Sequence, residues 1–107
     1  MGFFKEAHKR AMKNEAKRDP MLKSFADEIN NSPYTSAKAK VSYGSVFWKI
    51  PGRLDQGAGL VSQIFGRLVY DSIVYTGKDS FEADLGEYIL DAYEYKGEVE
   101  FQIRKKR

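Results

Sequence analysis

The residues that could carry catalysis are few in this chain of 107 residues. Its one histidine, His8, lies in a lysine-rich stretch. A serine–histidine–carboxylate triad needs a histidine held between a nucleophile and an acid, and the sequence shows no such arrangement around His8. The chain has no cysteine, which excludes a disulfide, a thiolate metal site and a cysteine nucleophile. We therefore predict a protein that is not an enzyme.

Acidic side chains are the remaining candidates for acid–base chemistry, and they are concentrated between positions 79 and 100. They lack the Asp-x-Asp-x-Asp-Gly order of a calcium loop, and the zinc ligand set is absent, so we expect no metal. A pair of carboxylates could still act as general acid and base, which keeps a small enzyme as a third alternative. The simpler interpretation is a solvated or partner-facing surface. The eight acids are Asp79, Glu82, Asp84, Glu87, Asp91, Glu94, Glu98 and Glu100.

The stretch Gly57-Ala58-Gly59 could present backbone amides to an anion, because we expect a loop there that leads into a helix. A dinucleotide-binding loop would need a third glycine, and Ser62 stands in that place. A phosphate-binding loop would need Gly-Lys-Ser/Thr, which is also missing. We interpret the two glycines as an ordinary loop and expect no cofactor.

Basic side chains suited to an anionic partner cluster at both ends of the chain. Residues 3–18 contain no glycine or proline and are rich in helix-forming residues, which predicts a helix. Four lysines recur along it at every fourth position and share one side, while Phe3 and Phe4 lie on the other. The predicted residues for an anionic partner are Lys5, Lys9, Lys13, Lys17, Arg104, Lys105, Lys106 and Arg107.

Three interpretations of this N-terminal helix remain open. The lysines could contact the phosphate backbone of a nucleic acid. They could instead meet anionic lipid while Phe3 and Phe4 insert, so that the protein attaches peripherally to a membrane surface. The structural interpretation places the thin apolar side of the helix on its own domain and leaves the lysines in solvent.

Charge is segregated along the chain. Residues 1–53 carry eleven Lys/Arg against five Asp/Glu, whereas residues 54–107 carry seven against ten. Segregated charge can steer a partner or drive self-association. The function we predict is that of a small non-enzymatic binding protein, which acts through its basic and acidic surfaces on a macromolecule. That macromolecule is a protein, another copy of this chain included, or a nucleic acid.

The stretch KVSYGSVFW, residues 40–48, partly resembles the octapeptide of RNA-recognition-motif domains, whose exposed aromatic residues stack on bases. The positions that fit are Tyr43, Gly44, Val46 and Trp48. The positions that depart are Val41 and Ser42, in place of a basic residue and glycine, and Ser45, in place of a stacking aromatic. That fold also opens with a strand, whereas helix and loop residues come first here. We therefore expect Phe47, Trp48 and Ile50 to pack in the core and Lys38, Lys40 and Ser42 to form a polar edge.

The helices and strands predicted along the chain position these residues, and together they indicate a single α+β domain over residues 1–107. Asp19-Pro20 starts a second helix that runs to about Ile29, and alternating residues predict a strand over 37–50. A loop over 55–59 precedes three apolar pairs at a spacing of four, which predict a helix over 58–70. We expect an antiparallel sheet of three to five strands. The sequence leaves open whether residues 1–18 dock on this domain, and it predicts a basic tail at 104–107.

The last third of the chain is ambiguous. Residues 80–96 could form a helix capped by Asp79 or part of a meander of strands. Residues 91–104 favour a hairpin with a three-residue loop at 96–98, in which Tyr93 would face Phe101 and Tyr95 would face Val99. Residues 71–76 could continue the preceding helix or begin a strand, and 76–79 form a turn.

The sequence also limits the location of the protein. The longest uncharged run near the middle lies between Asp55 and Arg67, and its eleven residues are too few to span a bilayer, which takes about 20. The first residues, MGFFKEAHKRAMK, contain no apolar stretch long enough for a secretion signal. We expect a cytoplasmic protein.

Overall fold

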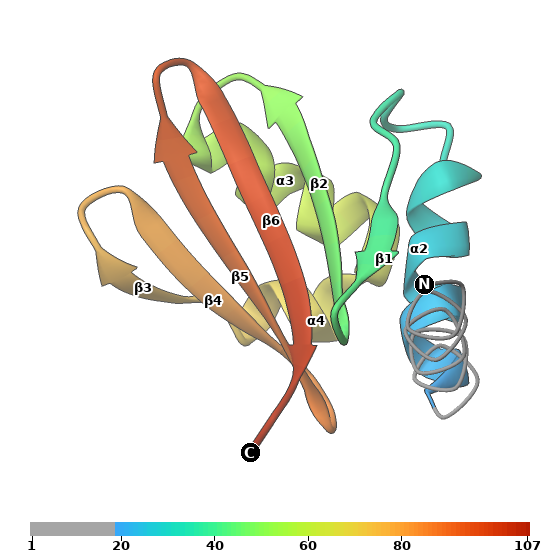
Figure 1. Ribbon diagram of the computed structural model, residues 1–107. Coiled ribbons are helices and arrows are strands. Elements are labelled where there is room, and N and C mark those ends of the chain that lie inside the picture. Colours follow the sequence, from blue (N-terminus) through green and yellow to red (C-terminus); the bar gives the residue numbers. More distant parts are fainter. Residues whose placement is uncertain (1–18) are drawn as a thin grey trace, which may run out of the picture.

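The computed structural model describes residues 19–107, which form an α+β fold (Figure 1). The helices are α2 (Pro20–Asn30), α3 (Leu54–Phe65) and α4 (Arg67–Asp71). The strands are β1 (Lys40–Ser42), β2 (Ser45–Pro51), β3 (Val74–Gly77), β4 (Ser80–Leu85), β5 (Tyr88–Tyr95) and β6 (Glu98–Lys105). The predicted α+β class is confirmed, and so is a helix that begins at Pro20. The helix predicted over 3–18 lies outside the described residues.

The strands form one antiparallel sheet in the order β1-β2-β6-β5-β4-β3. Its six strands exceed the three to five expected, because the strand expected over 37–50 is split into β1 and β2 and residues 74–77 add a further strand, β3. Residues 80–96 are strands rather than a helix. The helices lie together: in Figure 1, α3 and α4 are behind the sheet and α2 runs beside β1.

The hydrophobic core lies between these helices and one face of the sheet. Phe25 of α2 makes edge-to-face contacts with Phe65 of α3 and Tyr88 of β5, at ring-centroid distances of 6.1 and 5.3 Å. On the sheet, Trp48 of β2 stacks on Phe101 of β6 with centroids 4.7 Å apart and planes 4° from parallel. Burial of such large rings supplies most of the stabilising free energy in a domain of this size.

The expected single strand over 37–50 is a hairpin instead. Tyr43 and Gly44 both have positive φ, 49° and 75°, as the two-residue turns that match strand twist require. The turn separates β1 from β2 and pairs Val41 with Val46. The alternation that predicted one strand therefore belongs to two short antiparallel strands.

The predicted hairpin of β5 and β6 is confirmed, but its register is wrong by one residue. The turn is again two residues long, with Lys96 at φ 49° and Gly97 at φ 78°, rather than three. Tyr93 therefore pairs with Glu100, and Tyr95 pairs with Glu98. A shift of one residue moves every side chain of a strand to the other face of its partner. Both tyrosines consequently lie on the face opposite to the core.

The helix expected over 58–70 begins earlier and is broken. Residues 55–59, which we predicted as a loop, form the first turns of α3, and Gly57 and Ala58 are buried there. A Cβ at Gly57 would lie 3.1 Å from Phe101 Cζ and 3.1 Å from Val99 Cγ1, so glycine lets the helix approach the sheet. Gly66, at φ 96°, interrupts the helix between α3 and α4. The chain then leaves α4 at Asp71 and enters β3 at Val74.

Two side chains of the sheet hold the beginnings of helices. The free backbone amide of Leu54 donates to Glu94 Oε1 of β5 at 2.6 Å, which satisfies one of the unpaired donors at the start of α3. Asp19, which we expected to cap α2, makes no such bond with its side chain. Its carboxylate instead accepts a hydrogen bond from the Tyr88 hydroxyl.

Tyr88 predicts a loss of stability at alkaline pH. Burial, followed by the hydrogen bond to Asp19, raises the pKa of Tyr88 from 10.0 to about 12. Because the folded-state pKa is the higher one, the contribution of the neutral phenol is complete below pH 10.0 and is lost as the pH rises towards about 12. We expect the wild type to be more stable than Tyr88→Phe at neutral pH, by about 1 kcal/mol, and the difference to vanish above pH 10. Thermal unfolding of both proteins across this range measures it.

The matched control is Tyr95→Phe, in which the hydroxyl is removed from an exposed ring. Its stability difference from the wild type is expected to stay small at every pH. A Tyr88→Phe difference that did not change with pH would contradict the prediction.

Candidate functional site

The face of the sheet opposite to the core carries the candidate site. No helix of residues 19–107 covers this face, which we call the open face (Figure 1). Strand alternation decides which side chains lie on it, because successive residues of a strand point to opposite faces of the sheet. Each residue of the open face is therefore next in the chain to a residue of the core face. The open face includes Phe47 and Lys49 of β2, Glu100, Gln102 and Arg104 of β6, Asp91, Tyr93 and Tyr95 of β5, and Glu82 and Asp84 of β4.

Three aromatic rings of the open face are exposed to solvent. Phe47 is 43% exposed, Tyr93 is 48% exposed and Tyr95 is 53% exposed. Our expectation that Phe47 packs in the core is wrong, whereas Trp48, at 5% exposed, is buried as predicted and Ile50 packs against the core from a half-buried position. The reason is parity: adjacent residues of a strand point to opposite faces, so Phe47 and Trp48 cannot both be buried under one helical layer.

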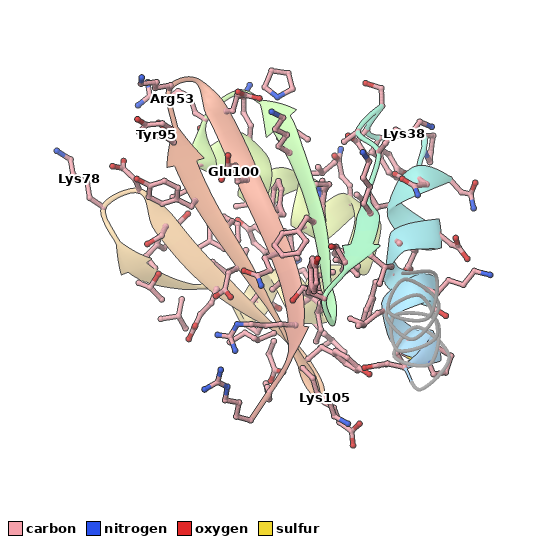
Figure 2. The ribbon with its side chains drawn as sticks, viewed as in Figure 1. Lys38, Arg53, Lys78, Tyr95, Glu100 and Lys105 are labelled. Carbon is pink, nitrogen blue, oxygen red and sulfur yellow. The ribbon has the colours of Figure 1, made fainter. Side chains whose placement is uncertain are left out.

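The two tyrosines contact each other and a neighbouring lysine. Tyr93 and Tyr95 stack with their ring centroids 6.2 Å apart and planes 19° from parallel. The Lys96 ammonium lies 5.3 Å from the centre of the Tyr95 ring, within reach of a cation–π interaction. Figure 2 shows Tyr95 at the upper end of β5 and Glu100 on β6. The two tyrosine rings and the Lys96 ammonium therefore form one contiguous surface.

Two hollows lie on either side of Phe47. One, of about 510 Å³, is lined by Lys38, Lys40 and Lys49 together with Phe47 and Glu100. The other, of about 240 Å³, extends from Phe47 and Glu100 across Gln102, Asp91 and Tyr93 to Ser80 and Thr76. Phe47 and Glu100 line both hollows.

Ion pairs neutralise part of the charge on this face. Arg104 Nε lies 3.1 Å from Asp91 Oδ2, and Lys49 Nζ lies 3.6 Å from Glu98 Oε2. Ser45, which stands where an RNA-binding octapeptide has an aromatic, is buried and its hydroxyl accepts a hydrogen bond from Gln102 at 3.1 Å. The open face thus presents aromatic rings among charges of both signs.

The basic tail that we predicted at 104–107 does not form one cluster. Arg104 belongs to β6 and pairs with Asp91, and Lys106 Nζ lies 2.7 Å from Asp84 Oδ1. Hydrogen bonds from Lys106 and from the Gly86 amide lower the pKa of Asp84, which keeps its carboxylate ionised beside Lys106. Lys105 and Arg107 are exposed, and Figure 2 shows Lys105 at the lower end of the sheet, near the C-terminus.

The N-terminal residues predicted to bind an anionic partner, Lys5, Lys9, Lys13 and Lys17, lie outside the described residues. The same holds for Phe3 and Phe4 of the membrane alternative. Both interpretations stay predictions. No helix within residues 19–107 is long and apolar enough to cross a bilayer.

The acidic stretch 79–100 is distributed rather than gathered into one surface. Asp84, Asp91 and Glu98 each pair with a base, and Glu94 accepts the Leu54 amide at the start of α3. Within residues 19–107, no three acidic or histidine side chains are arranged to hold a metal ion.

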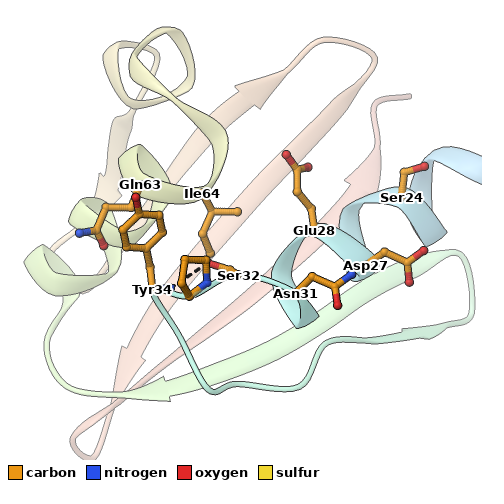
Figure 3. Close-up of a pocket in the computed structure, with 9 residues that line it drawn as sticks. Ser24, Asp27, Glu28, Asn31, Ser32, Tyr34, Gln63 and Ile64 are labelled. Carbon is orange, nitrogen blue, oxygen red and sulfur yellow. Dashed lines mark hydrogen bonds between the residues drawn. The ribbon is translucent and has the colours of Figure 1, made fainter.

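A third hollow, of about 510 Å³, lies between α2, the loop that follows it and α3 (Figure 3). Its lining includes Asp27 and Glu28 of α2, but no lysine, arginine or histidine. In Figure 3, Ile64 of α3 points towards Ser32, and Tyr34 lies beside Gln63. The lining offers neither an aromatic cluster nor a cation, so the open face is the stronger candidate.

Fold and site together define an α+β domain with a six-stranded antiparallel sheet that is covered by helices on one face and carries exposed aromatic residues on the other. No protein-family model matches the chain, and no curated protein or solved structure matches it either.

One feature of the sequence could have predicted which side chains lie on the open face. Tyr43-Gly44 and Lys96-Gly97 each place glycine second in a two-residue turn. A two-residue turn at 96–97 sets the register that puts Tyr93 opposite Glu100. We missed Tyr93 and Tyr95 as site residues because the three-residue loop placed both opposite core residues. We missed Phe47 because we expected it to be buried together with its neighbour Trp48.

Proposed function

We propose that this protein is a non-enzymatic binding protein whose open face docks a protein partner. The observation that carries the proposal is the exposure of Phe47, Tyr93 and Tyr95 on the open face. Large exposed aromatic residues that gather on one surface commonly mark an interaction site. Tyrosine and phenylalanine are enriched at protein interfaces, where each ring buries a large apolar area with little loss of conformational entropy.

The charges of the open face favour a protein over a polyanion. Lys40 and Lys49 lie towards one side of Phe47, but Glu100 stands beside it and Asp91 and Glu82 follow towards β4. A phosphate backbone laid across the strands would meet these carboxylates. A protein surface, which carries charges of both signs, can complement such a pattern.

Site-specific cross-linking tests the proposal. A benzoylphenylalanine residue is introduced at Tyr93, on the open face, or at Tyr34, an exposed tyrosine in the loop after α2. In cells that make the protein, irradiation is expected to give defined protein adducts from position 93 and none from position 34. The Phe47→Ala change, made in the position-93 protein, is expected to reduce the adducts at least about tenfold, since central aromatic anchors dominate binding. Equal adducts from both positions, or no effect of Phe47→Ala, would contradict the proposal.

A single-stranded nucleic acid is the second candidate, and the hollow lined by Lys38, Lys40 and Lys49 around Phe47 favours it. There a base could stack on the ring while lysines meet phosphates. A fluorescent oligonucleotide measures this: binding that weakens steeply with salt and is lost in Lys38→Ala and Lys40→Ala would identify a nucleic-acid site. Binding that is absent at low salt excludes it.

A further inference from the structure

Two hollows of opposite charge flank Phe47 on the open face. The smaller hollow is lined by Asp91 and Glu100 and by no lysine, arginine or histidine. Glu100 also lines the larger hollow, where it is the one acid among three bases, and Figure 2 shows it on β6, with Lys38 on the β1 side of the sheet. The three bases are Lys38, Lys40 and Lys49. The open face is therefore basic on one side of an exposed ring and acidic on the other.

Ion pairs within the domain leave this polarity in place. Lys49 and Asp91 each pair with a residue of opposite charge. The charges of the two hollows that take part in no ion pair within residues 19–107 are Lys38, Lys40 and Glu100. A partner that brings opposite charges to these groups gains attraction without breaking an existing pair.

A uniformly charged partner does not complement both hollows. A phosphate backbone that meets Lys40 would bring negative charge towards Glu100, and a purely basic partner would meet the lysines. A polypeptide segment can carry an acid, an apolar side chain and a base in succession. The sheet order separates Lys40 on β1 from Asp91 on β5 by three strand spacings, or roughly 14 Å at about 4.8 Å each. An extended segment rises about 3.4 Å per residue, so an acid and a base about four residues apart reach both hollows.

We propose that the open face binds a segment of another protein that carries an acidic, a large apolar and a basic side chain, in this order from β1 towards β5. The acid lies between Lys38 and Lys40, the apolar side chain packs on Phe47, and the base meets Glu100. The charge order of the two hollows carries the proposal, and the exposed ring between them supplies the apolar contact. It rests on the proposed function, since it names the chemistry of the protein partner at the same face.

Capturing the segment is the first step of the test. Mass spectrometry of the digested adduct from position 93 identifies the cross-linked segment of the partner. A synthetic peptide of this segment, labelled with a fluorophore, reports its dissociation constant for the unmodified protein by fluorescence anisotropy. The peptide is expected to bind and to contain an acid and a base about four residues apart, with a large apolar residue between them.

Charge reversal in each hollow then tests the order of the charges. Lys40→Glu and Glu100→Lys are each expected to weaken binding of the peptide at least about tenfold, because like charges would face each other. The direction for Glu100→Lys separates the classes of partner, since a nucleic acid or a purely acidic segment would bind this variant more tightly. A peptide whose acid is replaced by lysine is expected to bind Lys40→Glu at least about tenfold more tightly than it binds the wild type.

Matched controls carry the same charge changes elsewhere. Lys23→Glu and Glu28→Lys are at exposed positions on α2, outside the lining of both hollows, and they are expected to leave the dissociation constant unchanged. Circular dichroism and melting temperature verify that all four variants are folded.

Several outcomes would overturn the inference. A peptide that is indifferent to Lys40→Glu and Glu100→Lys, or that binds Glu100→Lys more tightly, rejects the charge order and leaves the proposed function standing. An adduct with a second copy of this chain does the same, because the segment would not come from another protein. Oligonucleotide binding that is lost in Lys38→Ala and Lys40→Ala assigns the basic hollow to a nucleic acid and also rejects the inference. The absence of any protein adduct from position 93 contradicts the proposed function and the inference together.

Discussion

Replacing Phe101 with alanine is expected to lower the free energy of unfolding by about 3–5 kcal/mol, the usual cost of removing a fully buried ring. Phe101 is 2% exposed and lies at the centre of the core face of the sheet. Its ring stacks on Trp48 and approaches the backbone of α3 at Gly57. Truncation would leave a cavity between the sheet and α3 that rigid neighbours cannot fill. Chemical denaturation, monitored by the fluorescence of Trp48, measures the loss.

The matched change is Phe47→Ala. Phe47 belongs to the adjacent strand β2 and is 43% exposed, so its truncation removes little buried area and is expected to cost less than about 1 kcal/mol. Equal losses in the two variants would show that Phe47 is buried, and would thereby contradict the assignment of the two faces. A small loss for Phe47→Ala also makes this variant usable in the cross-linking experiment.

The contrast between these two phenylalanines marks the limit of prediction from the sequence. The run Val46-Phe47-Trp48 is apolar on both faces of β2, and such a run is typical of a strand buried on both sides. The sequence pattern therefore identified the strand but not the exposure of one of its faces. An exposed aromatic and a buried one look alike in a pattern of hydrophobicity. Their difference depends on how many layers of helix the chain places on the sheet.

The tyrosines of β5 show how a local feature decides a site. The alternation over 91–104 predicted the hairpin, yet the faces depended on whether its turn contains two residues or three. Lys96 at a positive φ is uncommon for a residue with a side chain, and the alternation of apolar residues does not indicate it; only the glycine that follows, Gly97, favours a two-residue turn. One residue of turn length moved Tyr93 from opposite Phe101 to opposite Glu100, and with it the aromatic surface of the candidate site.

The basic surfaces could be predicted only in part, because a run of bases in the sequence does not show which acidic side chains each base pairs with in the fold. The run Arg104 to Arg107 has four bases in succession, but strand alternation sends neighbouring side chains to different faces. Arg104 and Lys106 then meet Asp91 and Asp84, which lie 13 and 22 residues away in the chain. Long-range pairing of this kind depends on the sheet order, which the sequence alone left open.

Gly57 is a further residue whose role depends on packing that the sequence does not show. Its substitution is expected to have the second large effect on stability. Two glycines within Asp55-Gln-Gly-Ala-Gly favoured a loop, because glycine destabilises a helix interior by about 1 kcal/mol relative to alanine. In the fold, Gly57 is buried against Phe101 and Val99, whereas a Cβ at Gly59 would meet nothing within 4 Å. One glycine is required by packing, and the other is free to change.

Gly57→Leu and Gly59→Leu therefore form a matched pair in the same helix. Both gain a similar amount of helix propensity, so their difference measures the steric clash alone. Gly57→Leu is expected to lower the free energy of unfolding by about 1–3 kcal/mol, since the added atoms must push α3 away from the sheet. Gly59→Leu is expected to raise it by up to about 1 kcal/mol, because the side chain enters solvent and the helix becomes more favourable. Urea denaturation of both variants decides the matter: if Gly57→Leu were as stable as Gly59→Leu, residues 55–59 would not pack on β6, and the loop predicted from the sequence would be the better description.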